Sequence, residues 1–170
     1  KNVNVKDIVN VELIKKYYNG ITYYSFCTKD NKYNNISIQI PYSNFKWTSM
    51  NDNVIILQIT DNETIKKLVD LHNCMYNIIK KNFKNIYRMS ICKLEFKEIR
   101  KNIETIYLSV HINKNMKNYD NIIKQIQSSN ENFLAKVLCS GKLWVLKNNS
   151  SCGIKFNVND ITINKSYNML

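Results

Sequence analysis

Glycine, proline and histidine are scarce in this 170-residue sequence, which contains three, one and two of them. Loops that bring backbone amides against a phosphate depend on glycine, so three glycines leave little material for a nucleotide cradle. The patterns GxxxxGK[ST], GxGxxG and GxSxG do not occur, and no D-x-D pair suggests a two-metal centre. The sequence therefore predicts a protein that is not an enzyme and that uses no metal or cofactor.

Cysteine is present, but in an arrangement that argues against disulfides and zinc. The cysteines are odd in number and widely spaced, and no two of them form a CxxC pair. The five are Cys27, Cys74, Cys92, Cys139 and Cys152. His72 lies near Cys74, but no second pair completes a zinc site. No apolar run is long enough to cross a bilayer, and no signal segment opens the chain. We expect free thiols in a soluble, intracellular protein that does not bind membranes.

The charge balance is strongly positive. The formal net charge is +12, from 25 Lys+Arg against 13 Asp+Glu, and Arg88 and Arg100 are the only arginines. Such a field favours polyanions, with nucleic acid first. The alternative is codon bias, because Asn, Lys, Ile and Tyr are abundant here and have AT-rich codons. Only clustered charge would separate the two interpretations.

Alternating apolar and polar residues predict about eight or nine strands. The expected strands are Ile21–Thr28 and 36–40 as a hairpin ending at Pro41, 54–60, 86–99 with a bulge near 92–93, 105–112, 133–139, 142–146 and 153–163. Ser140 and Gly141 are expected to break the chain between the sixth and seventh of these runs.

Three segments show helical spacing. The clearest is 62–83, where Thr60 and Glu63 fit a capping box and Ile65, Leu68, His72 and Ile79 share an apolar stripe. Its lysines form a solvated face or, alternatively, contact phosphate. A short second helix is expected over 119–128. Residues 3–18 predict a helix, with a strand as the alternative.

The order of these elements favours one domain over residues 1–170, with a polar tail at 164–170. No internal repeat or linker divides the chain. The fold class predicted is mainly β with one or two helices, as an OB-like Greek-key β-barrel whose helix caps one end.

Aromatic rings beside cations mark the candidate nucleic-acid-binding residues, because bases stack on rings while ammonium groups meet phosphates. Phe45 and Trp47 have an alternative role, which is to fill the end of the barrel. The candidates are Trp144, Trp47, Lys46, Lys142, Lys155, Tyr107, Arg88 and Lys93.

The closing stretch carries a family resemblance. Lys136-Val137-Leu138 is followed by Leu143-Trp144-Val145, a short turn, then Cys152-Gly153-Ile154-Lys155-Phe156-Asn157-Val158 and Ile161-Thr162-Ile163. This pattern resembles the end of the OB-fold domain in viral single-stranded-DNA-binding proteins, of podovirus phages and of large nucleo-cytoplasmic DNA viruses. Helix 62–83 also falls where such domains have one.

The resemblance implies single-stranded DNA binding and protection in viral DNA replication or recombination, with Trp144 and Lys155 on the DNA. It implies single-stranded DNA as partner, with RNA as an alternative, and replication proteins and further copies of the chain as additional partners. The location implied is host cytoplasm or nucleus, at sites of viral replication. An RNA-binding module of similar fold, and a structural or interaction protein whose charge is codon bias, remain alternatives.

Overall fold

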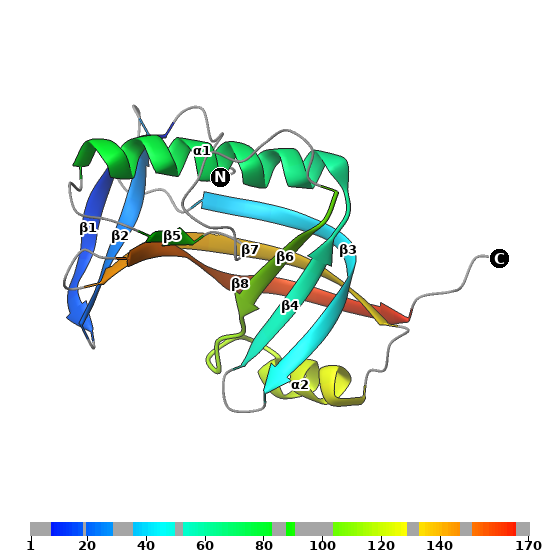
Figure 1. The fold of residues 1–170 in the computed structure, drawn as a ribbon. Coiled ribbons are helices and arrows are strands. Elements are labelled where there is room, and N and C mark those ends of the chain that lie inside the picture. The colour runs from blue at the N-terminus through cyan, green and yellow to red at the C-terminus, as the bar shows by residue number, and fades with distance from the viewer. Residues whose placement is uncertain are drawn as a thin grey trace.

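The computed structural model describes residues 8–18, 20–28, 36–49, 53–82, 88–90, 104–128, 133–146 and 151–165. These residues form eight strands and two helices (Figure 1): β1 (Ile8–Tyr18), β2 (Ile21–Thr28), β3 (Ile36–Ser49), β4 (Val54–Ile59), α1 (Asn62–Asn82), β5 (Arg88–Ser90), β6 (Ile106–His111), α2 (Tyr119–Ser128), β7 (Phe133–Leu146) and β8 (Ser151–Lys165).

Five of the strands close into a barrel. β3 pairs with β4, β4 with β6, β6 with β8, β8 with β7, and β7 returns to β3. All these pairings are antiparallel except β6 with β8. The predicted fold class is confirmed: the protein is mainly β, with two helices and a closed, OB-like five-stranded barrel.

The two helices occupy different places in this barrel order. α2 joins the third and fourth barrel strands, β6 and β7, whereas α1 is inserted between the second and third, β4 and β6. The helix between the third and fourth strands is the one that belongs to an OB barrel. The expectation that 62–83 corresponds to it was therefore wrong, and α2 takes that position.

Barrel and α1 share one core. Inward residues of the strands alternate with more exposed ones, as Ile106, Leu108 and Val110 do on β6. The buried side of α1 adds Leu68 and Met75 to the same cluster. His72 is also fully buried, as its place on the apolar stripe predicted.

The N-cap of α1 lies one residue later than predicted. Asp61, not Thr60, accepts a hydrogen bond from the Thr64 backbone amide at 2.9 Å and another from the Thr64 hydroxyl at 2.6 Å. These bonds, led by the one from the hydroxyl, hold the pKa of the Asp61 carboxyl below its usual value. A carboxylate at this position satisfies an amide that the first helical turn leaves free.

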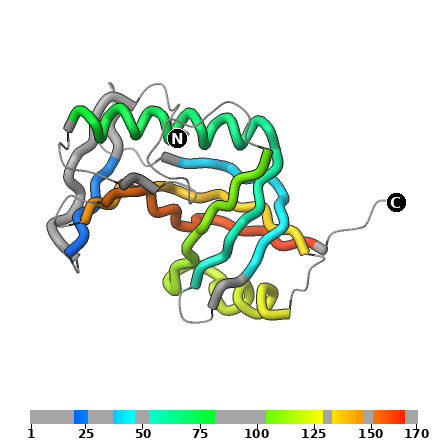
Figure 2. The backbone as a smooth tube through the Cα atoms, viewed as in Figure 1, coloured from blue at the N-terminus to red at the C-terminus, as the bar shows by residue number. Residues whose placement is uncertain are grey.

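β7 and β8 form a long hairpin that runs past the barrel (Figures 1 and 2). β2 pairs with the outer end of β7, β1 pairs with β2, and β5 pairs with the beginning of β8. The sheet therefore continues beyond the barrel as an extension, in the order β1-β2-β7-β8-β5.

The expected break at Ser140 and Gly141 was wrong, because β7 runs unbroken through both. Gly141 faces the core, where a Cβ would lie 2.8 Å from Ile154 Cγ2 and 3.2 Å from Phe156 Cε1. The glycine thus permits close packing against the fully buried Phe156, and does not end the strand.

Two N-terminal predictions are also corrected. Residues 8–18 form a strand and not a helix, which is the alternative left open, because they pair along β2. The expected hairpin of Ile21–Thr28 with residues 36–40 does not form. β7 lies between these two strands, and each of them pairs with it.

β3 does not stop at Pro41. The strand continues to Ser49, past the hairpin end that was expected at Pro41. The pairing with β7 shifts between Ile40 and Ser43, which places Pro41 and Tyr42 in a bulge. A proline has no amide to donate to the ladder, and a bulge removes the need for one.

Candidate nucleic-acid interface

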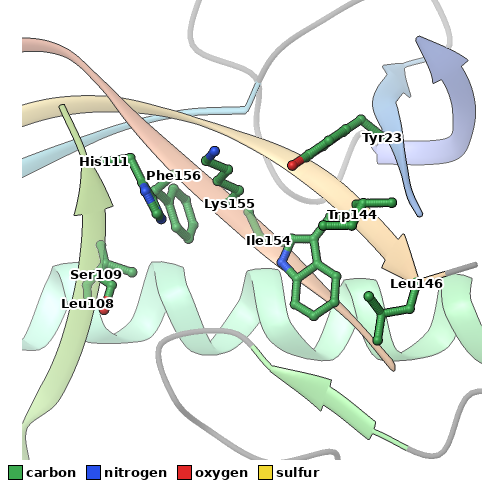
Figure 3. A pocket seen from close by; sticks show the side chains of 10 residues that line it. Tyr23, Leu108, Ser109, His111, Trp144, Leu146, Ile154, Lys155 and Phe156 are labelled. Carbon is green, nitrogen blue, oxygen red and sulfur yellow. The ribbon is translucent and has the colours of Figure 1, made fainter. Parts of the chain in front are cut away.

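A cavity of about 420 Å³ opens on the outer face of the sheet where the barrel meets its extension (Figure 3). Four consecutive strands, β6, β8, β7 and β2, supply its lining. The residues that line it are Ile21, Tyr23, Leu108, Ser109, His111, Trp144, Leu146, Ile154, Lys155 and Phe156. Figure 3 shows α1 behind these strands, on the side away from the viewer.

The aromatic part of the cavity follows from strand register. Along β7 the side chains alternate without interruption, so Trp144 faces outward while Leu143 and Val145 face the core. Trp144 lies directly opposite Tyr23 on β2 and opposite Gly153 on β8. Because Gly153 has no side chain, nothing from β8 competes at that position for the space next to the indole.

The cationic part comes from the same hairpin. Lys155 on β8 lies directly opposite Lys142 on β7, and neither forms an ion pair within the part of the chain that the structure describes. Like charges directly opposite each other are unfavourable in a sheet. No carboxylate is among the described residues that line the cavity. This pair is therefore placed to hold an anion.

β6 completes the wall with two polar side chains. Ser109 and His111 lie on its outward face, and Val110, between them, is paired with Phe156. Figure 3 shows the Tyr23 hydroxyl directed toward the side of the cavity that holds Lys155. The cavity lining thus combines the rings of Tyr23, Trp144 and Phe156 with the ammonium group of Lys155 and with the polar side chains of Ser109 and His111.

The structure brings together part of the predicted site. Trp144 and Lys155 both line the cavity, and Lys142 is adjacent in register. Tyr107 on β6 is 50% exposed and Lys46 on β3 is exposed, but neither contributes to the lining.

The remaining candidates lie partly or wholly outside the described residues. Trp47 belongs to β3 and Arg88 to β5, but their side chains are outside the description, as is the whole of Lys93. The expected contact of these residues with nucleic acid stays a prediction.

Tyr23 is the residue that the sequence did not single out. It stands in an aromatic run, ITYYSFCT, in which either Tyr23 or Tyr24 could face outward. Only the pairing of β2 with β7 decides that Tyr23 joins Trp144. Ser109 and His111 lie in a strand that alternation predicted, but their place in the cavity lining depends on the parallel pairing of β6 with β8.

Most of the described lysines lie away from the cavity. Exposed lysines are spread over α1, α2 and the segment before α2: Lys66, Lys67, Lys80, Lys81, Lys114, Lys117 and Lys124. The distribution of lysines therefore does not mark this site, which is defined by the residues that line the cavity.

Within the described residues, no group of three or more His, Cys, Asp or Glu side chains is placed to hold a metal ion. None of the helices in the described ranges is both long enough and apolar enough to span a bilayer.

Comparisons with protein-family models, with curated proteins and with solved structures find no match to this chain. The resemblance to viral single-stranded-DNA-binding proteins therefore stays a prediction, and the site is interpreted from its own geometry.

Proposed function

We propose that this protein binds single-stranded DNA without catalysis, through the outer face of β6, β8, β7 and β2. The observation that carries the proposal is the cavity itself, which places Trp144, Tyr23 and Lys155 around one space. Rings stack on unpaired bases, and ammonium groups neutralise phosphates. The expected role in viral DNA replication or recombination rests on the resemblance of the closing stretch to viral single-stranded-DNA-binding proteins.

The shape of the site favours single strands over duplex. A cavity of about 420 Å³ is in the range of small-ligand pockets, which suits one nucleotide at a time. In a duplex the bases are stacked on each other and their faces are covered. Tyr23 and Trp144 can stack only on bases that a single strand leaves free.

The position of the cavity is also consistent with the fold. OB barrels bind oligonucleotides on the face of their second and third strands, next to the loop between the fourth and fifth. β6 is the third barrel strand here, and the β7–β8 hairpin is formed by the fourth and fifth. Residues of β6 and of this hairpin line the cavity, whereas no residue of the second barrel strand, β4, is among them.

RNA is the second candidate ligand, and the hydroxyl groups of the cavity favour it. Tyr23 directs its hydroxyl toward Lys155, and Ser109 adds a second hydroxyl to the lining, so a ribose 2′-hydroxyl could donate or accept a hydrogen bond here. Competition between oligo-dT and oligo-rU of equal length separates the two ligands.

The test is fluorescence anisotropy with labelled oligo-dT and a matched duplex over a range of salt concentrations. The proposal predicts a preference for the single strand and an affinity that falls steeply with salt. Equal affinity for both forms, or no binding at low salt, contradicts it and leaves the lysine excess to codon bias.

A further inference from the structure

We propose that Tyr42, Lys136 and Asn164 form a second contact site for the same single strand, which runs along the outer face of β7 between this site and the cavity. The inference rests on the proposed function, and it concerns a surface on the barrel itself. It is carried by the geometry of three side chains that meet across three strands.

Tyr42 is held across the sheet. Its hydroxyl accepts a hydrogen bond of 2.8 Å from Nδ2 of Asn164 on β8, although Tyr42 itself belongs to β3. β7 lies between these two strands and pairs with both. The ring therefore extends over β7, and 42% of the residue is exposed.

A cation accompanies the ring. Nζ of Lys136 on β7 lies 5.9 Å from the centre of the Tyr42 ring. This distance is within the range of a cation–π contact. An exposed ring beside an ammonium group is the same combination that the cavity contains, and it suits a base next to its phosphate.

The backbone positions Tyr42 for this role. The residue sits in the bulge between Ile40 and Ser43, and the Ser43 hydroxyl bonds to the Pro41 carbonyl at 2.8 Å within it. Bulges re-aim side chains and are frequent beside functional sites. A ring fixed by Asn164 before binding loses less conformational freedom when a base stacks on it.

β7 connects the two sites along one face. Its side chains alternate from Ala135 to the end of the strand, so Lys136, Ser140, Lys142 and Trp144 all face outward in one row. At the usual rise of a strand, Lys136 and Trp144 are roughly 27 Å apart. An extended strand that contacts both therefore matches OB-type binding sites, which cover roughly 4–16 nucleotides.

One carboxylate lies beside this row. Asp160 on β8 is exposed and directly opposite Leu138, between Lys136 and Lys142. A DNA strand that follows β7 passes this negative charge. Asp160→Asn should therefore raise affinity for a strand long enough to reach both sites.

The experiment compares oligo-dT of about four and about twelve nucleotides by anisotropy. Tyr42→Leu is expected to weaken binding of the longer strand by roughly five-fold or more, and to leave binding of the shorter strand unchanged. Lys136→Gln should weaken binding of the longer strand more than Lys124→Gln does. The Lys124 variant is the control, because it removes the same charge from the exposed side of α2. Because Lys136 is exposed, Lys136→Gln tests the inference even if Tyr42→Leu folds poorly.

The outcomes separate this inference from the function on which it rests. If the wild type binds neither length, the proposed function fails and the second site fails with it. If the wild type binds the longer strand while Lys136→Gln matches Lys124→Gln and Asp160→Asn has no effect, the function stands and the second site is overturned.

Discussion

Trp144 lies directly opposite Tyr23 on the neighbouring strand, and both side chains line one cavity. The two residues are far apart in the sequence, and β2 is not part of the barrel. The added N-terminal strand thus supplies an aromatic wall that the barrel alone would lack. If the cavity binds bases, this pair acts as a unit.

The first prediction concerns that unit. Trp144→Ala and Tyr23→Ala should each weaken oligo-dT binding by about 1–3 kcal/mol, because each removes a stacking surface. The double variant should lose less than the sum, since both rings contact the same base. Asn121→Ala is the control, because Asn121 is exposed on α2 and lies outside the cavity lining. An equal loss in all three single variants would contradict the assignment.

The second prediction is that the loss of one lysine, Lys142, weakens DNA binding but stabilises the fold. Lys142→Gln should reduce the salt slope of single-strand binding by about 0.7, the value for one phosphate contact. The same change removes a like charge opposite Lys155 and should raise the free energy of unfolding, by up to about 1 kcal/mol. Salt-titrated anisotropy and urea denaturation measure the two quantities. A variant that loses stability while its salt slope stays unchanged would show that Lys142 acts in packing.

The third prediction tests the barrel. Gly141→Ala places a methyl group 2.8 Å from Ile154 Cγ2, so neighbouring side chains must shift. We expect a loss of about 1–3 kcal/mol in the free energy of unfolding, measured by urea denaturation. Ser140→Ala, at the adjacent outward position, should change it by about 0.5 kcal/mol or less. Similar values for the two variants would argue against close packing at Gly141.

The fourth prediction concerns thiol reactivity. Burial raises the pKa of Cys139 and of Cys152 to about 12, so both stay protonated in the folded protein. Since the thiolate is the reactive form, iodoacetamide at about pH 8 should label neither residue until the protein unfolds. Peptide mapping by mass spectrometry reads each cysteine separately, and rapid labelling of either one in the native protein would contradict the buried position.

The same pKa shifts predict a dependence of stability on pH. In the unfolded chain these thiols ionise with a pKa of 9.0, whereas in the folded protein they remain neutral at that pH. Stability from these groups is therefore present below that pH and falls as the pH rises toward about 12.

The parts of the fold that the sequence predicted correctly are those that depend on local period. The strand at β6 and the extent of α2 follow from alternation and from helical spacing. The errors arose at residues whose secondary structure or strand partner depends on a strand far away in the sequence. Residues 8–18, which were expected to be helical, form a strand because they pair with β2, and the hairpin of β2 with β3 is absent because β7 lies between them.

The candidate site divides in the same way. Trp144 and Lys155 could be found because they lie on one hairpin with a regular pattern. Tyr23 could not be separated from Tyr24, since only the order of strands in the sheet selects between them. Gly141 was taken for a local break because its reason, contact with Ile154 and Phe156, is a tertiary one.

The most direct test of the central claim uses Trp144 as its own reporter. Trp47→Phe leaves Trp144 as the only tryptophan of the chain. In a titration with oligo-dT, emission from Trp144 should be quenched with the same midpoint as the anisotropy of the labelled strand, because a base stacks on the indole. Anisotropy that reports saturated binding while Trp144 emission stays constant would contradict the account and place the DNA elsewhere on the protein.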